Sequence, residues 1–269
     1  MLIIKKDDDF IKKQLKFNFI KRIFITLFLI IFIYSSIQIL KIKRENYINE
    51  KNFSELRNVI KIDNNINKRS SIENIETEGN SEKSLINMYN INNDFAGWLN
   101  IPDTPIDYPV MSTPDNPNYY LRKDFNKNYS VSGTPFIGDG LNTDTKSFII
   151  YAHHMKNKKM FGSLEDYRNI EYKNTHEFIY FNTLNGNKIY KVVGAFYTQI
   201  DQDKDFFRYY DYCGNLNADK MNEFIKLLSK YSIYKGNSDI NTNDKVIMLS
   251  TCSYYAKNGR FVIVAKLIS

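Results

Sequence analysis

The sequence predicts a mostly β domain, folded as a barrel with a few helices, behind one membrane-spanning helix. Three observations lead to this fold class. An uncharged apolar run covers residues 23–40. From about residue 92 onward, short β-rich runs alternate with turn residues, a pattern typical of sandwiches and barrels. Aromatic residues, mostly Tyr and Phe, make up 15% of the chain, and they are enriched in strands.

The apolar run at residues 23–40 contains no charge over 18 residues, close to the ~20 that a helix needs to cross a bilayer. It has almost no polar face, unlike a core helix of a soluble protein. A cleaved signal peptide is the alternative, but its apolar region is shorter and ends in a small-x-small site. Ser35-Ser36-Ile37 matches that site poorly. The sequence therefore predicts an uncleaved anchor.

Flanking charge predicts the orientation of this anchor. Cytoplasmic flanks carry the excess of Lys and Arg, and here the excess precedes the run. We therefore expect the N-terminus inside the cell and the bulk of the chain outside. The positive residues before the run are Lys5, Lys6, Lys12, Lys13, Lys16, Lys21 and Arg22, and those after it are Lys41, Lys43 and Arg44.

Composition divides the rest of the chain into a stalk and a main domain. Apolar residues at helical spacing predict a helix near residues 50–60, and a polar stretch at 63–83 is typical of a linker. A second short helix is expected near Ser84. The predicted segments are a cytoplasmic tail at 1–22, an anchor at 23–40, a partly helical extracellular stalk at 41–84 and the main domain at 85–269.

Four apolar runs in the main domain predict buried strands. One helix interrupts the pattern, at residues 218–231, where apolar residues recur at helical spacing and Asn217 can cap the first turn. No internal repeat is visible. The predicted strands are residues 148–151, 190–196, 245–249 and 261–265.

Charge and cysteine content argue against nucleic-acid binding and against a disulfide framework. The net charge is +7, with much of it beside the apolar run in the first 44 residues, which indicates membrane orientation rather than nucleic-acid binding. Two cysteines, Cys213 and Cys252, are too few for a disulfide framework. They either form one bridge or are unrelated, and the sequence around Cys252 favours the second possibility.

The chemistry-bearing residues follow the predicted strands. Cys252 comes directly after one apolar run, and His153 and His154 come directly after another. Arg260 lies eight positions after Cys252, across a loop containing Asn258-Gly259. A strand, a loop and a returning strand would put Cys252 beside Arg260 at one end of the barrel. Thiol attack on an amide needs an activated thiol and donors for the oxyanion, and these residue types supply both.

Five parts of the main domain carry recognisable motifs, which follow one another in a characteristic order. They are 94–102 (Asp-Phe-Ala-Gly-Trp-Leu-Asn-Ile-Pro), 106–110 (Ile-Asp-Tyr-Pro-Val), 151–155 (Tyr-Ala-His-His-Met) with 160–164 (Met-Phe-Gly-Ser-Leu), 249–252 (Leu-Ser-Thr-Cys) and 258–262 (Asn-Gly-Arg-Phe-Val). Through these motifs the chain resembles the sortases, and within them class B, over about residues 85–269. Met248 and Ala152 stand where the family usually has Thr and Gly.

This resemblance implies a sortase-type closed barrel of about eight strands and a role for each matching residue. Cys252 matches the nucleophile, and His153, rather than His154, matches the acid/base. Arg260 matches the residue that binds substrate and stabilises the oxyanion. Ser250 and Thr251 are expected either to contact the substrate backbone or only to continue the strand.

The resemblance also implies a substrate class and a location. It implies cleavage after Thr in a C-terminal sorting motif of the Asn/Ser-Pro-x-Thr kind, through a thioacyl intermediate, and transfer of the surface protein to an amine of the peptidoglycan cross-bridge. The enzyme would act on the outer face of a Gram-positive cell membrane.

Metal, cofactor and oligomeric state are separate expectations. Three histidines could suggest zinc, but no second cysteine or carboxylate lies at ligand spacing, so we expect no metal. We also expect no cofactor and a monomer.

Other functions remain open at this stage. A pilin-polymerising transpeptidase would use a lysine of another protein as acceptor, and a plain cysteine protease would use water. An anchored binding module on an inactive sortase scaffold is a third possibility.

The remaining candidates have simpler explanations. His154 is expected to shape the pocket or face solvent, and His176 to be structural. Asp94 and Asp107 are expected to be turn or packing residues. A bridge from Cys213 would block Cys252, so we expect none.

Overall fold

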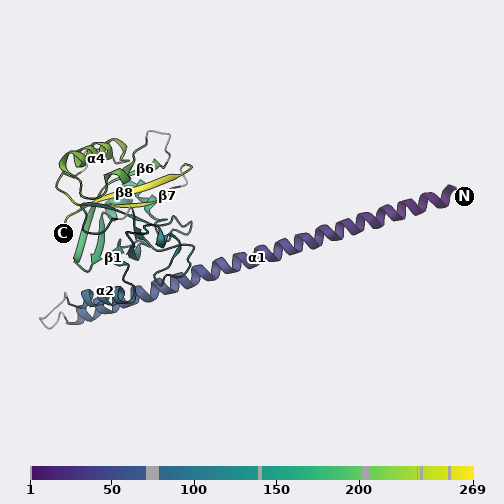
Figure 1. Cartoon of the computed structure of the whole chain (residues 1–269), viewed down its shortest axis with the longest axis horizontal. Coiled ribbons are helices and arrows are strands. Elements are labelled where there is room, and N and C mark those ends of the chain that lie inside the picture. Colours follow the sequence, from purple (N-terminus) through teal and green to yellow (C-terminus); the bar gives the residue numbers. More distant parts are fainter. Residues whose placement is uncertain are drawn as a thin grey trace. The chain divides into compact units, whose positions relative to one another are not determined.

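A computed structural model describes residues 2–70, 79–138, 141–200, 206–234, 236, 239–253 and 256–269. The chain divides into two compact units, Met1–Ile48 and Asn49–Ser269. Helix α1 (Leu2–Ser70) supplies the first unit and the first residues of the second (Figure 1).

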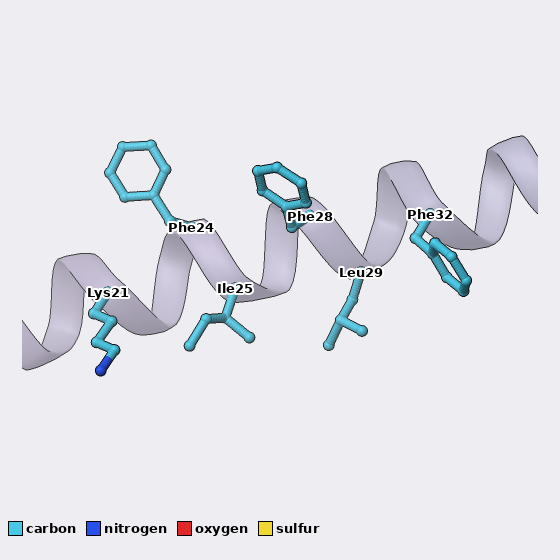
Figure 2. Close-up of a pocket in the computed structure, with 6 residues that line it drawn as sticks. All are labelled: Lys21, Phe24, Ile25, Phe28, Leu29 and Phe32. Atoms are coloured by element: carbon cyan, nitrogen blue, oxygen red, sulfur yellow. The ribbon is translucent and has the colours of Figure 1, made fainter.

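The first unit exposes apolar side chains on all sides of α1. Figure 2 shows Phe24, Ile25, Phe28, Leu29 and Phe32 projecting outward from the helix, and each is 50–75% exposed. Water solvates such a surface poorly. In the described part of the chain, α1 is the one helix whose length and composition suit a membrane span. The shallow hollow between these side chains is a feature of the exposed helix surface.

The second unit begins with the C-terminal part of α1, which packs on the main domain. Phe53 is only 2% exposed and belongs to the principal core, and the amide of Asn49 donates to the Ser130 hydroxyl (2.8 Å). The domain boundaries drawn from composition stay a prediction. The structure adds that residues of the expected stalk are part of the compact unit that contains the barrel.

The polar stretch at 63–83, predicted as a linker, is helical in its described parts. Residues 63–70 continue α1, and α2 (Gly79–Ile91) begins within the same stretch. Residues 63–70 contain neither Gly nor Pro, the two residues that most often end a helix. The rest of the predicted linker, residues 71–78, lies outside the described residues.

Eight strands close into a barrel in the order β1-β2-β3-β4-β7-β8-β6-β5, which confirms the predicted fold class. The pairs β2–β3 and β4–β7 are parallel, and the other neighbours are antiparallel. The strands are β1 (Phe95–Asn100), β2 (Asp107–Ser112), β3 (Phe136–Ile137), β4 (Ser147–Tyr151), β5 (Phe178–Thr183), β6 (Gly186–Gln199), β7 (Val246–Ser253) and β8 (Gly259–Leu267).

Strands β4, β7 and β8 are buried on both faces, which explains their continuous apolar runs. Leu249 and Ile150 point into the core inside the barrel. Met248 and Ile149 belong to a second cluster on the outer face, which α4 (Ala218–Tyr231) covers (Figure 1). Both faces of this wall are therefore held by packing, and the ends of its strands are held with it.

Helix α4 matches its sequence prediction, including its cap. The Asn217 side chain accepts a hydrogen bond from the Lys220 amide (2.9 Å), and Met221, Phe224 and Leu228 are buried. The remaining short helices lie in loops of the barrel. They are η1 (Tyr119–Arg122), η2 (Leu164–Arg168), α3 (Ile170–Thr175) and η3 (Tyr209–Tyr212).

Candidate active site

Cys252 is the penultimate residue of β7, and its side chain is exposed between buried neighbours. Alternation along the strand explains this contrast, because successive side chains point to opposite faces. Met248 lies on the outer face of the barrel, so Ser250 and Cys252 lie on the same face. β7 continues to Ser253, past the predicted strand end at residue 249. The thiol is therefore held by a paired strand and still accessible.

Arg260 is the direct partner of Cys252 across the antiparallel pair β7–β8, which confirms the predicted pairing. Directly opposite residues share a face, with Cβ atoms about 5 Å apart. Arg260 is half-buried, and its Nη1 donates to the Gly259 carbonyl (2.9 Å). The turn before β8 contains Asn258 at φ 57°, a left-handed conformation that Asn tolerates better than most residues.

His153 reaches the same end of the barrel by a parallel register. β4 pairs with β7 so that Tyr151 lies beside Ser250, and His153 and Cys252 each follow two residues later along their segments. The Ala152 amide donates to the Ser250 carbonyl (3.3 Å), so the alignment continues past the end of β4. Histidine, cysteine and arginine thus lie on three neighbouring chain segments.

The imidazole of His153 is partly buried and bound to backbone. Its Nε2 lies 2.8 Å from the carbonyl oxygen of Leu121 in η1. Burial lowers the pKa of His153 below its ordinary value of 6.5. The hydrogen bond to Leu121 opposes this effect, and the charge of Arg122 adds to it. A neutral imidazole that donates from Nε2 leaves Nδ1 able to accept a proton.

His154 makes a different contact from His153, and this contact fits the prediction that His154 shapes the pocket. Its Nδ1 lies 2.8 Å from the backbone carbonyl of Cys252. A ring nitrogen that donates to this carbonyl ties the segment after β4 to the strand that carries the thiol. His154 therefore shapes the site through the backbone of Cys252.

Ser250 and Thr251 are both buried, which argues against substrate binding by their side chains. Thr251 Oγ1 donates to the Ala152 carbonyl (2.9 Å), and Ser250 Oγ lies 2.7 Å from the Tyr209 hydroxyl. Thr251 is 2% exposed and Ser250 is 0% exposed. Of the two roles left open by the sequence, the structure favours the structural one, because both hydroxyls bind inside the protein.

Sequence reasoning missed two groups at this site. The Leu121 carbonyl has no side-chain signature, so no motif identifies it. Glu165, in η2, accepts a hydrogen bond from the hydroxyl of Ser253 (2.5 Å), the residue that follows Cys252. Only the spatial arrangement of the loops reveals either contact.

The other candidate residues make contacts that are typical of structural roles. His176 stacks on Tyr172 with ring centroids 4.0 Å apart. Asp107 accepts from the Trp98 indole (2.7 Å), and Asp94 binds the Tyr120 hydroxyl (2.8 Å). Cys213 and Cys252 are not joined by a disulfide, as predicted.

Comparison with known proteins identifies the class. The family model described as the Sortase domain matches residues 99–268. Sortase B of Listeria monocytogenes is 30% identical over 71% of this chain and 76% of its own length. Sortase B of Staphylococcus aureus is 29% identical over 66% of this chain and 72% of its own length.

Solved structures agree with these matches. Sortase B of Clostridium perfringens is 27% identical with a TM-score of 0.61, covering 68% of this chain and 99% of that one. A sortase B–substrate complex of S. aureus, 23% identical, has the same fold, with a TM-score of 0.68 over 84% of this chain and 99% of that one. The chain belongs to the sortase family of cysteine transpeptidases. Its relatives place it within class B.

Proposed function

We propose that this chain joins surface proteins to the cell wall by a class B sortase reaction. It would cleave a C-terminal Asn/Ser-Pro-x-Thr motif after Thr and transfer the protein to an amine of the peptidoglycan cross-bridge. The observation that carries the proposal is the exposed Cys252 thiol, which is directly paired with Arg260 on a strand that neighbours the one leading to His153. These three residues are the proposed catalytic groups.

The first half of the reaction makes a thioester. Cys252 Sγ, as the thiolate, bonds to the Thr carbonyl carbon, and the C–N bond to the next residue breaks. His153, as the imidazolium, gives its proton to the leaving amine. In the second half an incoming amine attacks the thioester and loses a proton to His153. The C–S bond then breaks, and the thiolate is restored.

The environment of His153 supports this acid/base role. Because burial lowers its pKa, the imidazolium is the minor form at neutral pH. A protonated group with a lowered pKa is a stronger acid toward the leaving amine. The thiolate–imidazolium pair would therefore be present in only part of the enzyme population.

Arg260 supplies positive charge on the face of the sheet that carries the thiol. A guanidinium offers five N–H donors, and the contact to the Gly259 carbonyl uses only Nη1. Its other donors can bind the substrate backbone and the oxyanion that forms on the Thr carbonyl.

The first unit fits the role of an anchor. Its exposed apolar side chains would face lipid, and the excess of Lys and Arg before residue 23 favours a cytoplasmic N-terminus. The barrel would then lie outside the cell, where surface proteins and cell-wall amines are found. The cytoplasmic tail would then be residues 1–22, the anchor 23–40, the stalk 41–84 and the catalytic domain 85–269.

The test uses the full-length chain in detergent with quenched peptides that carry candidate motifs. Triglycine is a reasonable first acceptor, because a sortase B has been solved in complex with this peptide. We expect cleavage after Thr and a peptide–triglycine product. Cys252→Ala should abolish both, and Cys213→Ala, the matched control, should leave them intact.

Each other outcome contradicts part of the proposal. No cleavage by the wild type favours an anchored binding module, and full activity in Cys252→Ala would exclude this nucleophile. Hydrolysis without transfer to any amine favours a protease. Transfer only to a lysine of a partner protein favours a pilin-polymerising enzyme.

A further inference from the structure

The wall formed by β1, β2 and β5 presents a cluster of polar and aromatic side chains on the outside of the barrel. Leu99 and Phe181 point into the core, so their neighbours along the strands point outward. The registers of β1 with β5 and of β1 with β2 bring these outward residues together. They are Trp98, Asn100, Asp107, Tyr180 and Asn182.

A hollow of about 260 Å³ lies over this cluster. Arg57 and Ile60, from the part of α1 that belongs to the same unit, form another side of it. Ligand pockets for drug-sized molecules run from about 300 to 1,000 Å³. This hollow, which we call the β1–β5 hollow, therefore suits one ring rather than an extended ligand.

The charged groups of the hollow are already paired. Arg57 Nη2 lies 2.6 Å from Glu50 Oε1, and Asp107 accepts from the indole N–H of Trp98 (2.7 Å). Arg57 and Asp107 carry opposite charges, so the side chains that line the hollow have no net charge. The hollow therefore favours a neutral ligand.

Three neutral polar side chains of the hollow differ from Trp98 in having no partner among the described residues. Within the residues that the structure describes, the side chains of Asn100, Asn182 and Tyr180 make no hydrogen bond to protein. All three are half-buried. Each Asn amide offers N–H donors and a carbonyl oxygen as acceptor, and the Tyr180 hydroxyl can both donate and accept. Groups that converge on one hollow in this way can bind a ligand rich in hydroxyl or amide groups.

We propose that the β1–β5 hollow binds one ring of a neutral saccharide, held by the amides of Asn100 and Asn182. A peptide is a poorer fit. β1 is paired on both sides, with β2 and β5, so it cannot accept an added strand. Since β1 lies on the opposite side of the barrel order from β7, the hollow is separate from Cys252, and the inference goes beyond the proposed function.

The experiment measures binding of triacetylchitotriose, a neutral saccharide with hydroxyl and amide groups, to the full-length chain by calorimetry. A detergent without a sugar head group is needed, because a maltoside would compete. Asn100→Ala/Asn182→Ala should weaken binding about tenfold or more, since it removes two hydrogen-bonding groups. Asn222→Ala, an exposed asparagine on α4, should leave binding unchanged.

Two further variants keep the result interpretable. Asn182→Leu keeps a side chain of similar shape but replaces the amide with methyl groups, and it should also weaken binding. Cys252→Ala should bind like the wild type while losing peptide cleavage, which separates this inference from the proposed function. No binding by the wild type, or equal binding by the Asn100/Asn182 double variant, would overturn the saccharide site.

Discussion

The barrel has two walls that differ in how their polar side chains are hydrogen-bonded. On the β4–β7–β8 wall, Thr251 and Ser253 donate hydrogen bonds inside the protein, and His153 binds the Leu121 carbonyl. On the wall formed by β1, β2 and β5, which we call the β1–β5 wall, Asn100 and Asn182 have no such partner among the described residues. The first wall therefore uses its polar groups to fix its own geometry.

This difference indicates how each wall can act. Internal hydrogen bonds around one exposed thiol would hold the proposed catalytic groups in place before substrate arrives, which lowers the cost of orienting them. Unpaired groups at a half-buried surface cost little while water reaches them, and they remain open to a ligand. Variants on the β4–β7–β8 wall should therefore lose activity or stability. Variants on the β1–β5 wall should lose only ligand binding.

The largest effect is expected at His153, the proposed acid/base. His153→Gln keeps a donor for the Leu121 carbonyl but removes the titrating group, so peptide cleavage should fall roughly 10²–10⁴-fold. His154→Gln and His176→Gln are matched controls and should lose much less. Steady-state rates with the quenched peptides measure this. A larger loss in His154→Gln than in His153→Gln would mean that the acid/base is the other residue of the pair.

A stability effect comes next. Thr251→Val keeps the side-chain shape but removes the donor to the Ala152 carbonyl (2.9 Å). A buried acceptor left without its partner costs about 1–3 kcal/mol. Urea unfolding of the full chain in detergent should show the free energy of unfolding reduced by that amount. An unchanged value would mean that this wall does not depend on its internal hydrogen bonds.

Local sequence signals predicted much of this architecture. The pattern of Met221, Phe224 and Leu228 together with Asn217 indicated both the face and the start of α4. β7 and β8 are consecutive strands with a short connection, so the pairing of Cys252 with Arg260 follows from chain order. Apolar runs, caps and hairpins are properties of neighbouring residues, and a single sequence contains them.

Contacts between distant residues could not be predicted in this way. His153 and Leu121 are 32 positions apart, and Asn49 and Ser130 are 81 apart. Leu121 acts through its backbone, which every residue shares. The packing of residues 49–60 on the main domain was missed because helical spacing shows that a face is apolar, not what covers it. The buried hydroxyls of Ser250 and Thr251 likewise gained their roles from partners on other elements.

A smaller effect should appear in the pH dependence of stability. The pKa of His153 is lowered in the folded protein from its ordinary value of 6.5, so between these two values the unfolded chain binds more protons. Stability is therefore full above about 6.5 and is lost as the pH falls toward the folded pKa. Thermal unfolding across this range should show a smaller loss in His153→Gln than in the wild type. An equal loss would mean that burial does not disfavour the imidazolium.

The smallest effect is expected on the β1–β5 wall. Asn182→Ala removes a half-buried amide that has no protein partner among the described residues, so the free energy of unfolding should stay within about 0.5 kcal/mol of the wild type. The same urea titration used for Thr251→Val measures it. A loss as large as that of Thr251→Val would show that Asn182 holds the barrel together. The two walls would then not differ, and the unpaired amide would no longer argue for a ligand.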